Sequence, residues 1–355
     1  MNESHYSFAA LSGVQGRKSN FLIQVPLKVL SKFLKEDDSH LPVVDRSQRV
    51  LNKVRVGQIA KYIVENPDSY ILPPLVAYIK SGEVKFIKNE NTINLGVLKI
   101  DIGAEIQLFD GQHRRAAIEE AIKLRKYVGD ETIAVMLYSN ESIESAQQVF
   151  ADININATKP AQSIKLLYNH RDQINQETRK LIELVPFFKQ YVDYERTNLS
   201  SKSECIFTFS GIYQLVKTML TELGDGVDTK QISSFWIAVS EVIEQWVQLN
   251  MKLIEPEKLR ANYVHAHSVI WLALANLGCY LFKNHPTDWK KYVEKLKDLN
   301  WSRTDHQWQG RCVILGRISK SRQSVILSEN VIYRNIGIAL PSVNQNFEDK
   351  FNLGN

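Results

Sequence analysis

The residues best placed to do chemistry form the run Phe109–Arg115, which reads Phe-Asp-Gly-Gln-His-Arg-Arg. The apolar stretch before this run predicts a strand, and the helical spacing of the apolar residues after it predicts a helix. The run would therefore lie where a helix begins, and the free N–H groups and dipole of a helix N-terminus attract anions. Because Arg114 and Arg115 fall in the first turn, this turn is a candidate phosphate site.

Two other interpretations of the turn stay open. In the first, Asp110 caps the helix while the two arginines are solvated or pair with Glu119 and Glu120, so that the turn is purely structural. In the second, Asp110 and His113 serve a nucleotide hydrolase or a DNA nickase, with Asp110 holding a divalent ion. The sequence contains no Walker A loop, nucleophile elbow or HExxH motif, and no metal site is evident. We therefore assign no catalytic residue.

A second cluster of anion-binding side chains precedes and opens the helix expected from the apolar positions between residues 56 and 63. It consists of Arg46, Gln48, Arg49, Asn52, Lys53 and Arg55. A phosphodiester backbone fits such groups, and we expect them to bind DNA. The alternative is a charged face that is merely solvated.

The basic charge of the chain is concentrated near its C-terminal end. Residues 295–322 hold seven Lys or Arg side chains against two aspartates, and this surplus equals the net charge of +5 of the whole chain. Trp301, His306 and Trp308 are interleaved among them, and arginines with aromatic rings suit a nucleic-acid surface. The expected DNA contacts are Arg303, Arg311, Arg317 and Arg322. The tryptophans could equally anchor this segment to the rest of the protein.

Length and composition bound the class of protein. The chain has 355 residues, 44% of them hydrophobic and 23% charged, which predicts a globular protein with more than one domain. Its mild basicity permits contact with nucleic acid. Cys205, Cys279 and Cys312 lack the close spacing of a zinc knuckle or a redox pair. We find no secretory leader and no apolar stretch long enough to span a membrane, so we expect a cytoplasmic protein without a membrane partner.

The elements that must position these residues follow from periodicity. Strands are expected at 21–25, 75–79, 83–87, 105–109 and 133–138, and the pattern from 160 to about 286 is nearly all helical. His265 and His267 have the wrong spacing for one helix face and are expected to pack or cap. We predict an α+β protein in three parts, which are an α+β domain at 1–168, a helical domain at 169–290 and a basic extension, rich in Trp and Arg, at 291–355.

Three segments together resemble a known family. Asp110–Arg114 spells the signature of the DGQHR domain, and Arg46-x-Gln-Arg-x-x-Asn-x-x-Arg55 and Phe150–Asn156 resemble the DndB family of DNA sulfur modification proteins. The likeness spans most of residues 6–170. The DGQHR domain is similar to the ParB and sulfiredoxin superfamily, which implies a ParB/sulfiredoxin-like N-terminal domain with a mixed sheet, followed by a mainly helical C-terminal domain.

The same resemblance implies site residues. In that superfamily the corresponding turn grips nucleotide phosphates, which implicates Gly111, Gln112, His113, Arg114 and Arg115 and suggests a nucleoside triphosphate as ligand. The residues implied to lie beside the pocket are Asn154, Asn156 and Lys159. ParB has Gly-Glu-Arg-Arg where this chain has Asp-Gly-Gln-His, so the resemblance does not extend to cytidine triphosphate. Sulfiredoxin has a cysteine at the place of Gln112, so sulfinic-acid reduction is not implied either.

For biology, the resemblance implies a role in bacterial DNA phosphorothioation, in which sulfur replaces a non-bridging phosphate oxygen. It suggests a DNA-binding transcriptional regulator or accessory component. The expected partners are double-stranded DNA at the promoter of its operon and other phosphorothioation proteins.

Overall fold

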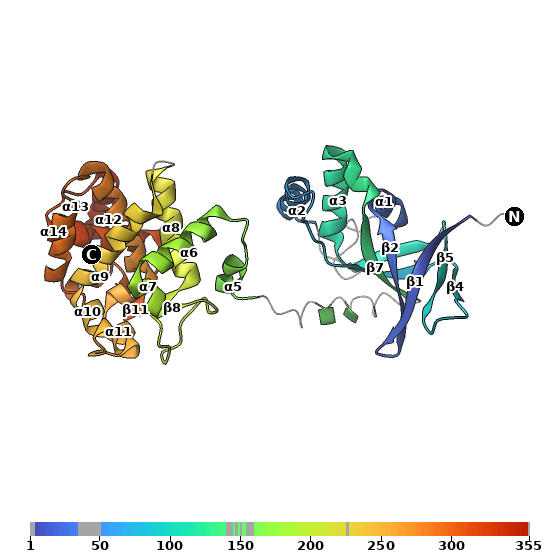
Figure 1. Ribbon diagram of the computed structural model, residues 1–355, viewed down its shortest axis with the longest axis horizontal. Helices are drawn as coiled ribbons and strands as arrows, with labels where there is room; N and C mark the ends of the chain where they lie inside the picture. The colour runs from blue at the N-terminus through green and yellow to red at the C-terminus, as the bar shows by residue number, and fades with distance from the viewer. Residues whose placement is uncertain are drawn as a thin grey trace. The chain divides into compact units, whose positions relative to one another are not determined.

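The computed structural model describes residues 4–34, 51–139, 145, 148–149, 151–153, 160–224 and 227–353. The chain divides into two compact units, Met1–Thr158 and Lys159–Asn355. The first is built on a mixed sheet and the second is mainly helical (Figure 1). The expected α+β class is therefore confirmed.

A seven-stranded sheet forms the first unit, in the order β4-β5-β1-β2-β7-β3-β6. Its strands are β1 (His5–Gln15), β2 (Lys18–Pro26), β3 (Leu75–Ser81), β4 (Val84–Lys88), β5 (Leu95–Asp101), β6 (Glu105–Asp110) and β7 (Thr132–Ser139). Neighbouring strands run antiparallel except β3 and β7, which are parallel. The parallel pair lies next to β6, the strand that leads into the DGQHR turn.

The five strands expected from periodicity are all present, but β1 and β5 were not expected. β1 mixes apolar residues with small and polar ones, and most of its side chains are exposed or half-buried. It is a strand because its first part, His5–Leu11, pairs with β5 and its second part, Ala10–Gln15, pairs with β2. Such long-range pairing leaves little trace in the local sequence.

Within residues 4–34 and 51–139, three helices accompany the sheet and lie together along one side of it (Figure 1). They are α1 (Leu30–Phe33), which follows the 3-10 turn η1 (Leu27–Val29), α2 (Lys53–Glu65) and α3 (Gln112–Leu124), which leads to η3 (Lys126–Asp130). α2 buries Ala60 and Ile63, and α3 buries Ala117, Ile118 and Ala121. Apolar side chains of the helices and the sheet form one core, which fixes where α2 and α3 begin.

The second unit packs helices around a core rich in aromatic side chains. Its helices are α5 (Gln162–Leu167), α6 (Gln173–Leu184), α7 (Pro186–Tyr191), α8 (Phe209–Leu223), α9 (Thr229–Val242), α10 (Glu244–Asn250), α11 (Pro256–Asn262), α12 (Ser268–Asn284), α13 (Trp289–Glu294), α14 (Arg322–Ile336) and α15 (Ser342–Leu353). Two short strand pairs join them, β8 (Val192–Asp193) with β9 (Phe207–Thr208) and β10 (Val313–Ile314) with β11 (Arg317–Ile318). None of the helices in the described ranges combines the length and hydropathy needed to cross a bilayer.

The two units divide the chain differently from the three expected parts. α5 belongs to the helical unit, because the Ser163 hydroxyl donates to the Arg196 carbonyl at 2.7 Å and lies 3.0 Å from the hydroxyl of Ser210. Residues 291–355 belong to it as well, since Trp308 and Tyr333 are buried in the same core as α8 and α12. The boundary therefore falls before residue 160, and the basic segment is part of the helical unit.

Candidate functional site

Two helix N-termini meet at the DGQHR turn. α3 begins after Gly111, whose φ of +109° an L side chain rarely adopts. A Cβ at this position would also lie 2.4 Å from Cδ2 of the buried Leu75, so only glycine fits. α2 begins after Asn52, whose side chain accepts a hydrogen bond from the Arg55 N–H and caps the helix.

His113 joins these two helix starts. Its Nε2 accepts a hydrogen bond from the backbone N–H of Asn52 at 3.0 Å, so the imidazole is neutral and carries its proton on Nδ1. Burial, together with the positive charge of Arg55, lowers the pKa of His113, while Asp110 acts in the opposite sense. The neutral ring is therefore the stable form, and the link holds the start of α2 against the start of α3.

We predict that His113 titrates below the ordinary histidine pKa of 6.5. Its link to Asn52 then contributes stability above pH 6.5 that is lost as the pH falls through the lowered pKa. Arg55→Ala should raise the pKa of His113, because a nearby positive charge disappears, whereas Arg125→Ala, at the other end of α3, should leave it unchanged. NMR titration of the imidazole resonances measures the pKa of His113 in the parent and in the two variants. A pKa at or above 6.5 in the parent protein would contradict the neutral, hydrogen-bonded ring that we describe.

A cavity of about 580 Å³ opens where the two helices begin. Its polar lining comprises Arg55, Gln58, Tyr62, Asp110, Gln112, His113 and Arg114, with the backbone of Gly111 and Pro73. Arg55 is exposed and forms no salt bridge with any carboxylate among the described residues. The Oε1 atom of Gln112 is buried and has no hydrogen-bond partner in the described part of the chain. These groups and the helix N-termini together favour an anionic ligand.

Arg114 is engaged by the protein itself. Its Nη2 pairs with the Asp110 carboxylate at 2.5 Å, and its Nη1 donates to the carbonyls of Pro73 and Pro74 at 2.7 and 3.0 Å. The expectation that Asp110 caps α3 is therefore wrong, because α3 has no side-chain cap and the carboxylate turns to Arg114 instead. Arg114 shapes the cavity wall, and Arg55 is the cation of the lining that no described carboxylate neutralises.

The other predicted site residues divide into three groups. Arg115 does not line the cavity, since its side chain is 8% exposed and pairs with Glu119 at 3.0 Å. Lys53 is exposed in the first turn of α2. The remaining predicted residues of this unit and its end lie outside the described residues, and they are Arg46, Gln48, Arg49, Asn154, Asn156 and Lys159.

Sequence reasoning missed two polar lining residues, Gln58 and Tyr62. With Arg55 they are spaced by three and four residues, which places all three on one face of α2. That polar stripe, opposite the buried Ala60 and Ile63, was the signal that could have revealed them.

The four C-terminal arginines have different environments. Arg317 and Arg322 are exposed, and Arg303 donates to the carbonyl of Gly316. Arg311 instead makes two 2.6 Å hydrogen bonds to the carboxylate of Glu348, which is fully buried. Trp301 and Trp308, expected either to stack on nucleic acid or to anchor the segment, are buried and lie against each other with ring centroids 5.6 Å apart.

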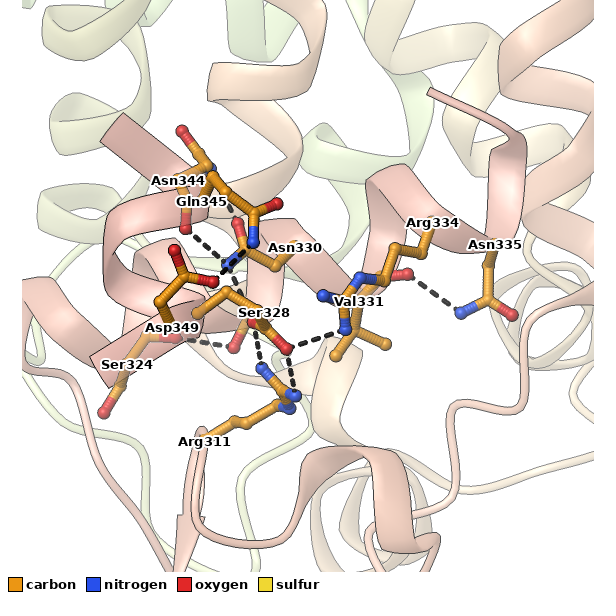
Figure 2. Close-up of polar contacts among 11 residues, drawn as sticks. Arg311, Ser324, Ser328, Asn330, Val331, Arg334, Asn335, Asn344, Gln345 and Asp349 are labelled. Carbon is orange, nitrogen blue, oxygen red and sulfur yellow. Dashed lines mark hydrogen bonds and ion pairs between the residues drawn. The ribbon is translucent and has the colours of Figure 1, made fainter. Parts of the chain in front are cut away.

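Glu348 stands at the centre of a polar network in the C-terminal part of the helical unit. In Figure 2, Arg311 approaches from the preceding loop, while Asn330 and Arg334 extend from α14. Arg334 donates to Glu348 at 2.7 Å and Asn330 at 2.9 Å, and Asn330 also exchanges hydrogen bonds with Asn344 of α15. Although burial raises the pKa of Glu348, the hydrogen bonds from Arg311 and Asn330 and the two guanidinium charges lower it to about 2. The network fastens α15 to α14.

The structure has features both for and against a catalytic role of Asp110 and His113. Asp110 lines the cavity with its side chain 43% exposed, yet it is paired with Arg114, and Nε2 of His113 is already bonded to Asn52. Within the described ranges, no group of three or more His, Cys, Asp or Glu side chains is arranged to hold a metal ion.

Comparison with known proteins gives one family. The model of the family described as DndB, DNA-sulfur modification-associated, matches residues 8–339. No curated protein and no solved structure matches the chain.

Proposed function

The chain belongs to the DndB family of DNA-sulfur modification-associated proteins, and from this premise we propose that it is a DNA-binding accessory component of DNA phosphorothioation. In this role it binds the promoter DNA of its own operon and restrains transcription. One observation supports the proposal most: the cavity of about 580 Å³ where α2 and α3 begin, with Arg55 unpaired among the described carboxylates at its rim.

The cavity is proposed to hold a phosphate group. Arg55 supplies the positive charge, and the first N–H groups of α3 together with the dipoles of both helices supply further attraction. Its volume is large enough for a nucleotide, so the phosphate belongs either to the DNA backbone or to a nucleoside triphosphate effector. Gln112 would use its buried, unpartnered oxygen to accept a hydrogen bond from the sugar or base.

Exposed cations are proposed to extend the DNA contact. Lys53 is exposed two residues before Arg55 in the chain, and Arg317 and Arg322 are exposed in the helical unit. Arg46, Gln48, Arg49 and Arg303 complete the proposed set. Arg311 is left out, because both of its terminal nitrogens are bound to Glu348. Other phosphorothioation proteins are proposed as further partners.

DNA binding should weaken steeply with salt, because cation–phosphate contacts release counterions. We expect Arg55→Ala to lower the affinity for the operon's upstream DNA about tenfold and to reduce the salt slope by about one. Arg125→Ala removes the same charge away from the cavity and serves as control. Fluorescence anisotropy over a range of salt concentrations, with and without ATP, measures these effects. Salt-independent binding, no binding, or equal losses in the two variants would refute the proposal.

One observation favours a second candidate, a nucleotide hydrolase or DNA nickase. Asp110 faces the same cavity with a partly exposed carboxylate, a group suited to holding a divalent ion. This candidate requires ATP turnover or DNA nicking in the presence of Mg²⁺, abolished by Asp110→Ala. Binding of ATP without turnover would eliminate hydrolysis of that nucleotide.

A further inference from the structure

The helical unit contains a second cavity, of about 450 Å³, that no function described so far uses. It lies where α8 and α12 begin, and the loop at residues 197–199 and Lys320 complete its wall. The charged or titratable side chains of its lining are Arg260, His267 and Lys320, and the lining includes no carboxylate. A cavity whose charges are all of one sign attracts ligands of the opposite sign.

The two permanent charges at this cavity are not neutralised by described residues. Neither Lys320 nor Arg260 forms a salt bridge with a described carboxylate. Arg260 is held in place by main-chain oxygens, since its guanidinium donates to the carbonyls of Ser201 and Ser203 at 2.7 and 2.6 Å and to that of Cys205. Hydrogen bonds to neutral carbonyls fix the position of this group, and although the charge of Glu257 acts on it, no described carboxylate lies within ion-pair distance of its guanidinium.

The positive charges around this cavity also act on His267. Its Nε2 donates to the Arg260 carbonyl at 3.0 Å, so the ring is anchored in the wall. Burial lowers the pKa of His267 to about 4, and the charges of Arg303, Lys320 and Arg260 also lower it, against the effect of the hydrogen bond. The imidazole is therefore neutral at neutral pH, and its Nδ1 is an acceptor for a ligand donor.

The rest of the lining combines polar side chains with an apolar wall. Thr208 and Ser210 are buried, with 7% and 8% of their surface exposed, and the amides of Gln162 and Gln214 stand at the rim. Trp271 and Leu272 provide an apolar wall. The hydroxyls of Thr208 and Ser210 already bond to each other and to Gly211 and Ser163. The amides, the cations and the apolar wall together make a mixed surface that matches a nucleoside phosphate.

We propose that this cavity binds a nucleoside phosphate, with its phosphate near Lys320 and Arg260 and its sugar or base against Trp271. The phosphate ester can come from a free nucleotide or from a DNA strand. The proposal does not rest on the cavity at the DGQHR turn, because it involves other residues in the other unit.

Tryptophan fluorescence gives a selective readout of ligand binding. All six tryptophans lie between residues 236 and 308, in the helical unit, and Trp271 lines the cavity. The probes are ATP and a single-stranded oligothymidylate of eight nucleotides, titrated by calorimetry and by fluorescence excited at 295 nm. Saturable binding with a change in fluorescence supports the site. Binding of ATP alone assigns a free nucleotide, and binding of the oligonucleotide in competition with ATP assigns a DNA strand.

The test variant is Gln214→Glu, which introduces a carboxylate of nearly the same shape into the lining at an exposed position. We expect the affinity of the fluorescence-detected site to fall at least about tenfold, because the bound phosphate would then face a like charge. Gln231→Glu makes the same change at an exposed position of α9 and should bind as the parent does. Lys320→Ala, with Lys230→Ala as its control, tests the cation separately.

The outcomes also separate the two cavities. If Gln214→Glu and Lys320→Ala lose the fluorescence change while Arg55→Ala keeps it, the second site stands whatever becomes of the first. If Gln214→Glu and Lys320→Ala bind like the parent, the second site is overturned and the proposal for the DGQHR cavity is unaffected. If the parent shows no saturable binding of either probe, the second site is overturned as well, and the DGQHR cavity keeps only the backbone of promoter DNA as its source of phosphate.

Discussion

Glu348→Gln is expected to lower the free energy of unfolding of the helical unit by about 3–5 kcal/mol at neutral pH. The substitution removes the carboxylate that two arginines share and leaves Arg311, whose side chain is only 11% exposed, without its anion. It also removes an acceptor from Asn330, so the contact between α14 and α15 weakens. Losses of this size follow when one partner of a buried ion pair is removed.

Tryptophan fluorescence during urea unfolding measures this effect in the helical unit alone, since that unit holds all six tryptophans. Glu183→Gln is the matched control. Glu183 pairs with Lys189 at 2.5 Å, but both side chains are about 60% exposed, so a change within about 1 kcal/mol is expected. If the two variants lose the same stability, the Glu348 network is not the fastening that we describe.

The same network makes a prediction about pH. Because the pKa of Glu348 falls from 4.5 to about 2 in the folded protein, its contribution to stability is complete above pH 4.5 and is lost as the pH falls from 4.5 towards 2. The stability difference between the parent and Glu348→Gln should therefore be constant near neutral pH and shrink below pH 4.5. A stability difference that grows on acidification would contradict the lowered pKa of Glu348.

The second large effect is expected for Gly111→Ala, which should destabilise the sheet-containing unit by about 2–4 kcal/mol. An alanine at this position must adopt a φ of +109°, and its Cβ would lie 2.4 Å from the buried Leu75 side chain. The start of α3 would have to shift, and with it the link from His113 to Asn52. The phosphate binding that we propose for the DGQHR cavity should be lost as well.

Gly16→Ala separates backbone strain from steric conflict. Gly16 also has a positive φ, +59°, but a Cβ there would meet nothing within 4 Å, so a cost of about 1 kcal/mol is expected. Far-UV circular dichroism during urea unfolding follows both units, and the tryptophan signal serves as the internal reference for the helical unit. Equal stability of the two alanine variants would mean that the turn tolerates a side chain.

The local pattern was sufficient wherever one element decides its own structure. The pattern of residues 105–109 and the helical spacing after Gly111 predicted β6 and α3. The residues of the DGQHR motif line the cavity where α2 and α3 begin, because they form the turn between β6 and α3. The family resemblance, read from the same residues, is confirmed over residues 8–339.

Only the tertiary structure decided which partner each charged side chain has. Arg55, Arg114 and Arg311 look alike in the sequence, but one faces a cavity, one is neutralised by Asp110 and the third is bound by Glu348, 37 residues further along the chain. The partners of a cation come from elements brought together by folding, and neither periodicity nor spacing records them. For the same reason β1 emerged only from its pairing with β2 and β5, and the second cavity only from the meeting of α8, α12 and Lys320.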